Sequence, residues 1–120
     1  MDRSILTSIK KLLGIAEDYE HFDQDLIIHI NSVFAILKQM GAGPAEGFFI
    51  SDKTSEWSDF TNGELDIEMI KSYVYLKVRL LFDPPLSSAV MESINRLISE
   101  LEWRISVAVD PADTFTEVAP

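Results

Sequence analysis

Apolar residues recur every three or four positions along most of this chain, which is the spacing of one face of an α-helix. The first such segment begins after a cap at Asp2 or Ser4 and ends at Gly14. The second begins at Asp23, its predicted N-cap, and ends at Gly41. The pattern therefore predicts two amphipathic helices in the first third of the chain.

Two further predicted helices are separated by a strong stop signal. They span about residues 64–82 and about residues 87–107. Between them stands Asp83-Pro84-Pro85, where two prolines remove two backbone donors and each disfavours helical geometry in the residue before it. The sequence therefore predicts an angled helix pair with no room for a catalytic loop.

Residues 41–63 lack helical periodicity and combine glycines with large apolar side chains. The run Phe48-Phe49-Ile50 has the composition of a short strand, and Trp57 and Phe60 are spaced for one helical turn. Four helices and one structured loop predict a mainly α fold. We expect one helical domain over residues 1–107, followed by an extended C-terminal tail.

The composition indicates the broad class to which the protein belongs. The 120 residues are 47% hydrophobic and 25% charged, so a globular domain is expected rather than a disordered chain. Cysteine is absent, which excludes disulfides and fits a reducing compartment. No apolar run resembles a signal peptide or reaches the ~18 residues of a membrane span. We therefore expect a soluble, intracellular protein.

The net charge of −10 is distributed unevenly. Residues 67–107 are neutral overall, whereas residues 41–66 hold six acids and one base, and residues 108–120 hold three acids and no base. Proteins that grip nucleic acid neutralise its phosphates with lysine and arginine, so tight binding of nucleic acid is not expected.

Candidate catalytic and metal-binding residues are few. His21 and His29 are interpreted as surface or boundary histidines, because nothing nearby completes a zinc site. The acidic turn at residues 17–25 lacks the central glycine and distal glutamate of a calcium-binding EF-hand loop. No phosphate-binding loop or nucleophile elbow is present. We therefore predict no catalytic residue, no metal site and no cofactor.

Three departures from simple amphipathicity predict contacts between subunits. Lys77 falls on the apolar face of its helix, where it either packs its stem and reaches solvent or forms an intersubunit salt bridge. Trp103 points away from the apolar stripe, beside Arg96 and one turn before Val107, as in an interface hot spot. The alternative is that the chain's own loop or tail covers this tryptophan. The third departure is the apolar content of the loop: Phe48, Phe49, Ile50, Trp57 and Phe60.

Half of those loop side chains are expected to cap the helical core, and the remainder would form a patch too apolar for a lone monomer. The tail has apolar positions of its own at Val109, Phe115 and Val118, in an acidic, proline-containing strip. Such a strip either stays disordered or orders on a partner by filling a groove or adding a strand.

Seven short runs keep a characteristic order and spacing. They are ILTSIKKLLGI (5–15), DLIIHINSV (25–33), ISD (50–52), WSDF (57–60), YVYLKVRLLFDPP (73–85), INR (94–96) and ELEWR (100–104). Together they resemble the phage head–tail connector proteins, also called head completion or adaptor proteins, of long-tailed phages and the prophages derived from them. The resemblance covers residues 4 to about 107 and does not extend to the tail.

The resemblance implies a helical subunit that forms a ring, typically twelvefold, beneath the portal vertex of the capsid. Such a ring extends the DNA channel and receives the next neck or tail-completion protein. The implied location is the virion neck, after assembly in the bacterial cytoplasm. The resemblance also implies a portal-docking role for the C-terminal tail.

Physical reasoning about such a ring assigns roles to two surfaces. A ring needs a heterologous, closing contact, and the Trp103 face and the loop at residues 48–60 are the expected two sides. Acidic channel walls repel phosphate and let a DNA duplex slide without tight binding. The expected channel-facing acids are Glu46, Asp52, Glu56 and Asp59.

A different class of function is the alternative. A monomeric, acidic helical module, either a DNA mimic or a regulator, would bind a basic partner directly through its negative charge. In that case Trp103 would be covered within the monomer.

Overall fold

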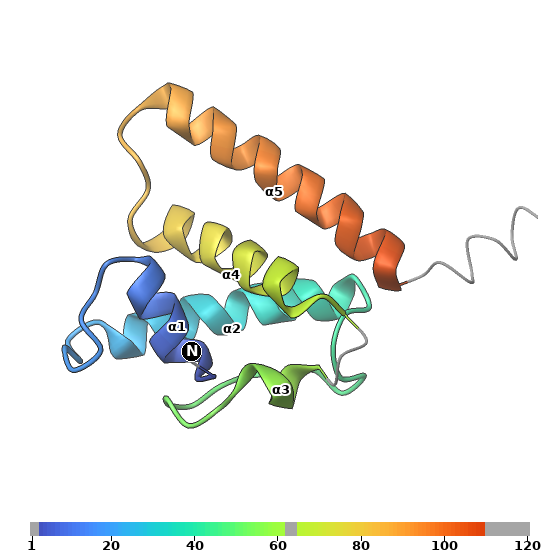
Figure 1. Ribbon diagram of the computed structural model, residues 1–120, viewed down its shortest axis with the longest axis horizontal. Helices are drawn as coiled ribbons and strands as arrows, with labels where there is room; N and C mark the ends of the chain where they lie inside the picture. The colour runs from blue at the N-terminus through green and yellow to red at the C-terminus, as the bar shows by residue number, and fades with distance from the viewer. Residues whose placement is uncertain (1–2, 62–64, 110–120) are drawn as a thin grey trace, which may run out of the picture.

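The structure is a computed structural model that describes residues 3–61 and 65–109 (Figure 1). In this part of the chain the secondary structure is helical, with one isolated β-bridge between Ser4 and Glu56. The predicted mainly α fold is confirmed. The helices are α1 (Ile5–Leu12), α2 (Asp23–Gln39), α3 (Trp57–Phe60), α4 (Ile67–Phe82) and α5 (Ser88–Val109).

Helix α1 is capped and anchored at its first turn. The Ser4 hydroxyl accepts a hydrogen bond from the backbone N–H of Thr7 at 3.2 Å, which selects Ser4 as the N-cap. The Ile5 N–H donates to the carbonyl of Ser55 at 3.0 Å. The start of α1 is thereby tied to the loop that leads into α3.

The start of α2 differs from the prediction. Phe22 occupies the N-cap position, so the assignment of Asp23 as N-cap was wrong. Instead, the Asp23 carboxylate forms an ion pair with Lys10, 2.9 Å from Nζ and without hydrogen-bond geometry. Lys10 is only 2% exposed, and its Nζ also donates to the carbonyl of Glu17 at 2.9 Å. A buried ammonium needs such partners, which explains why Asp23 turns toward it.

Helix α2 is the centre of the fold. It packs against both α1 and α4, and its buried stripe faces them (Figure 1). The core cluster joins residues from every helix. Its fully buried members include Ile5, Leu6, Ile9, Leu26, Ile30, Val33, Leu37, Ile70, Tyr73, Val74, Val78 and Ile105.

Helices α4 and α5 form the angled pair that the prolines predicted. The α4 helix starts at Ile67, a few residues later than expected, because the Asp66 carboxylate caps it by accepting from the N–H of Glu68 at 3.0 Å. The α5 helix runs to Val109, two residues beyond the predicted end. In Figure 1 the two helices diverge toward the linker that joins them.

One polar contact fixes α5 onto α4. The Tyr73 hydroxyl donates a 2.8 Å hydrogen bond to Glu102, and burial together with this carboxylate raises the pKa of Tyr73. Ile94, Ile98 and Ile105 complete the inward face of α5. Every helix in the described part of the chain is too short or too polar to cross a lipid bilayer.

The ion pair beneath α2 generates a stability prediction. Asp23→Asn should lower the free energy of unfolding by about 1–3 kcal/mol, because it leaves the buried Lys10 ammonium without its anionic partner. Asp25→Asn is the matched control, since Asp25 also lies in the first turn of α2 but is exposed. It should change the same quantity by less than about 0.5 kcal/mol. Urea unfolding followed by circular dichroism measures both, and equal effects would contradict a specific role of Asp23.

Candidate functional site

The outer face of α5 presents an unpartnered aromatic side chain. Trp103 is 67% exposed on the side of α5 opposite to Ile98 and Ile105. Arg96 lies two helical turns before it and Val107 one turn after it, and both are exposed. No described loop covers this tryptophan. The Trp103 face, defined by Arg96, Trp103 and Val107, therefore has the composition of a contact surface.

The predicted loop set divides between core and surface. Ile50, Trp57 and Phe60 are buried within the subunit. The rings of Phe60 and Phe34 lie 5.0 Å apart, and the Trp57 indole N–H donates to the Ser8 hydroxyl at 3.1 Å. Three of the five loop residues expected at an interface are thus already satisfied by α1 and α2, and they offer little area to a neighbour.

Phe48 and Phe49 point in different directions. Phe48 is half-buried, with its ring edge-on to Phe34 at 5.0 Å and to Phe60 at 5.5 Å. Phe49 is 73% exposed. Successive side chains of an extended segment alternate between its two faces, so burial of Phe48 and Ile50 turns Phe49 outward. The expected run of three does not form a strand.

A side chain that sequence analysis missed holds this segment in place. Asn31, on α2, accepts from the Ile50 N–H at 2.7 Å and donates to the Ile50 carbonyl at 2.9 Å. The amide thus satisfies both backbone groups of a buried residue in the way that a neighbouring strand would. The available signal was a polar, hydrogen-bonding residue beside the apolar stripe of α2.

The four acids expected to face the channel are solvent-accessible to different degrees. Glu46, Asp52 and Asp59 are exposed, and Glu56 is half-buried. Asp59 accepts from the Glu56 N–H at 2.8 Å at the start of α3. Hydrogen bonds from the Thr54 hydroxyl and N–H lower the pKa of Asp52. The Glu56 carboxylate in turn faces the backbone N–H of Asp59 in a capping box, so three of the four carboxylates also shape the local backbone.

The remaining predicted residues lie at separate places. Lys77 is half-buried on α4, and no carboxylate of the described residues forms an ion pair with it. Val109 ends α5 and packs partly against the core. Phe115 and Val118 lie outside the described residues. Among the predicted site residues that the structure describes, the exposed aromatic side chains are Trp103 and Phe49.

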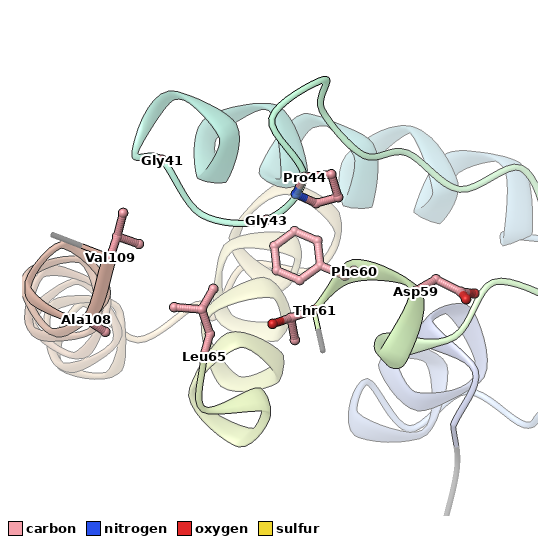
Figure 2. Close-up of a pocket in the computed structure, with 9 residues that line it drawn as sticks. All are labelled: Gly41, Gly43, Pro44, Asp59, Phe60, Thr61, Leu65, Ala108 and Val109. Atoms are coloured by element: carbon pink, nitrogen blue, oxygen red, sulfur yellow. The ribbon is translucent and has the colours of Figure 1, made fainter. Parts of the chain in front are cut away.

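A pocket of about 350 Å³ lies where the ends of α2, α3 and α5 meet (Figure 2). The Phe60 ring fills the space beneath Gly43, where a Cβ would lie 2.5 Å from the ring, and Val109 stands on the other side. The φ angle of Gly43 is +89°, so glycine is required there for conformation as well as for space. Of the side chains that line the pocket, one is a carboxylate and one a hydroxyl, which does not make a catalytic pair.

Metal-binding chemistry receives no support from the described residues. Within residues 3–61 and 65–109 no group of three or more His, Cys, Asp or Glu side chains is placed to hold a metal ion. His21 packs edge-on against Phe22 with ring centroids 4.9 Å apart.

The two segments that carry Trp103 and Phe49 lie on opposite sides of the fold. In Figure 1, α5 runs along the upper side, and the segment that leads into α3 runs along the lower side, with α1, α2 and α4 between them. Trp103 projects from the first and Phe49 belongs to the second. A subunit with this layout can contact one neighbour on each side.

The sequence model of the phage connector protein family matches residues 5–112 of the 120. The chain belongs to this family. The resemblance noted in the sequence is thereby confirmed. Phage connector proteins are in general structural rather than enzymatic, and membership indicates a virion role in joining head to tail, at the neck of the particle. No curated protein and no solved structure matches the chain.

The clamp on the loop generates a prediction for this connector. Asn31→Ala should lower the free energy of unfolding by about 2–3 kcal/mol, because it leaves the N–H and carbonyl of Ile50 unpaired in a buried position. It should also increase amide hydrogen exchange at Ile50 and Phe49. Asn95→Ala, at an exposed position of α5, is the control and should change neither quantity. Unchanged exchange in Asn31→Ala would show that packing alone holds the loop.

Proposed function

We propose that this phage connector protein assembles into a closed ring beneath the portal vertex and extends the DNA channel from the head toward the tail. The observation that supports the proposal is that Trp103 and Phe49 are both exposed and belong to segments on opposite sides of the fold, α5 and the segment before α3. Different surfaces that meet on successive copies form a heterologous contact, and such contacts close into rings when the rotation per subunit permits.

One charge on the Trp103 face complements the segment that carries Phe49. Arg96 is exposed on α5, whereas Arg104 already lies 3.6 Å from Glu100 on the same helix. The segment that carries Phe49 is acidic. Opposite charges at the rim of an aromatic contact favour its register and suppress wrong pairings, while the buried aromatic centre supplies most of the affinity. Lys77, half-buried and without a carboxylate partner among the described residues, is proposed to pair with a neighbouring subunit.

The acids of the loop also fit a channel wall. Some of the loop carboxylates would contact the neighbouring subunit, and the others would face the lumen and repel DNA phosphates. These carboxylates belong to Glu46, Asp52, Glu56 and Asp59. Repulsion of this kind suits a conduit, because the duplex has to pass without binding tightly.

The remaining contacts of the proposed ring are with its neighbours along the neck. The segment from Val109 onward, with Phe115 and Val118, is proposed to dock on the portal. The opposite end of the ring would receive the next neck or tail-completion protein, and twelvefold symmetry would match the portal. The alternative of a monomeric acidic module expects Trp103 to be covered within the subunit, whereas the described residues leave it exposed.

Substitution of the exposed tryptophan tests the proposed ring. Trp103→Ala should abolish ring formation and leave the helical circular dichroism signal nearly intact, because loss of a hot-spot aromatic costs about 2 kcal/mol or more per contact. Light scattering and electron microscopy, alone and with the cognate portal, measure the outcome. Ile28→Ala is the matched control, since Ile28 is similarly exposed but lies on α2. Unfolding of Trp103→Ala would show that Trp103 belongs to the core.

Salt dependence tests the electrostatic part of the proposal. Each copy carries a net charge of −10, so subunits repel one another over long distances at low salt. Raising the salt from 0.01 M to 0.15 M shortens the screening length from about 30 Å to about 8 Å and should increase oligomerisation. The exposed arginine contacts oppose this trend, but they contribute only about 1 kcal/mol or less each. A decrease in oligomer size over this range, measured by light scattering, would contradict the proposed repulsion.

A further inference from the structure

The linker between α4 and α5 presents a second apolar surface that the sequence analysis did not assign. Leu86 is fully exposed, and Leu81 and Val90 on either side of it are about half exposed. Pro84 and Pro85 fix their own φ angles and restrict the backbone that leads to Leu86. We call Leu81, Leu86 and Val90 the elbow. A large apolar side chain that projects from a linker with two restricted φ angles is partly pre-organised for insertion into a cavity.

A groove between α1 and α4 offers such a cavity. Its volume is about 420 Å³, and its apolar side chains are Leu12, which is half exposed, and Tyr75. Apolar pockets of about 150 Å³ already accommodate a benzene molecule, so the groove has room for a leucine side chain. The polar side chains that line the groove are Ser8, Lys11, Glu68, Lys71 and Ser72.

The charges around the groove and the elbow are complementary. Two lysines and one glutamate line the groove, which gives the lining a net charge of +1. Lys71 lies 3.7 Å from Glu68, and Lys11 lies 3.8 Å from Glu17. At the elbow, Asp83 is the single charged residue in the stretch 80–91, and it is exposed.

We propose that the elbow of one copy inserts Leu86 into the α1–α4 groove of a second copy, with Asp83 facing Lys71. The inference rests on the proposed ring and names an additional contact within it. Full exposure of Leu86 shows that the subunit's own groove does not hold it. A knob and a groove at different places on one chain make a heterologous contact, as the ring requires. None of these groove residues belongs to the Trp103 face or to the Phe49 segment.

The absence of cysteine from the chain allows a direct test by cross-linking. Purified Leu86→Cys and Leu12→Cys variants are mixed, oxidised mildly and analysed on non-reducing gels. We expect the mixed disulfide at least about tenfold above that of a Leu86→Cys and Ile28→Cys mixture, because docking raises the effective thiol concentration toward the millimolar range. Equal yields in the two mixtures would overturn the proposal. Because each variant has one cysteine, every mixed product joins two copies.

Reversing the charges of Asp83 and Lys71 supplies a second test of the proposed contact. Asp83→Lys and Lys71→Glu should each decrease the ring fraction in light scattering, and mixing the two variants should restore contacts in which the exchanged charges meet. If the ring fraction of the mixture does not exceed that of either variant alone, the proposed contact between Asp83 and Lys71 is wrong. Circular dichroism establishes that each variant is folded before assembly is compared.

The outcomes separate this inference from the proposed ring. If Leu86→Asp forms normal rings while Trp103→Ala does not, the elbow contact is wrong and the ring stands. If Leu86→Asp forms rings that no longer bind the portal, the elbow docks on the portal and the inference is overturned. A wild-type protein that stays monomeric at every concentration and salt overturns both.

Discussion

The packing of α5 on α4 determines which surface this connector has available for assembly. Helix α4 buries Ile70, Val74 and Val78 in the core around α2, and α5 packs chiefly on α4. A helix with one neighbour hides one stripe and exposes the rest. The Tyr73–Glu102 hydrogen bond fixes the rotation of α5, so the stripe with Trp103 faces outward. The assembly surface is thus a consequence of how the core is filled.

The helices could be predicted from sequence because their apolar residues follow the helical period over several turns. The Pro84-Pro85 pair predicted where α4 ends, and the glycine after α2 predicted where α2 ends. The error at Asp23 has a physical cause: its partner Lys10 lies thirteen positions earlier on another helix. Burial of a lysine on the polar side of a short amphipathic helix cannot be read from periodicity. Long-range ion pairs of this kind compete with local capping for the same carboxylate.

The candidate site shows the same division. Exposure of Trp103 followed from helical geometry, because a regular helix relates buried and exposed positions by a fixed angle. The loop has no such period, so sequence alone could not decide which aromatic side chains cap the core. The two hydrogen bonds of Asn31 to Ile50 decide it, and they join residues nineteen positions apart. The elbow was missed because its prolines explained the turn without indicating that Leu86 stays exposed.

The contact between the end of α5 and the end of α2 has a mechanical consequence. Val109 sits directly over Gly41, where even a Cβ atom would approach it to 2.9 Å. The last turn of α5 is therefore clamped at its far end, while its first turns diverge from α4 (Figure 1). A force applied to the chain at Val109 would act first on the glycine turn after α2. It would reach the linker between α4 and α5 only through the length of α5. Force arriving from that direction therefore reaches the contact between α5 and the end of α2.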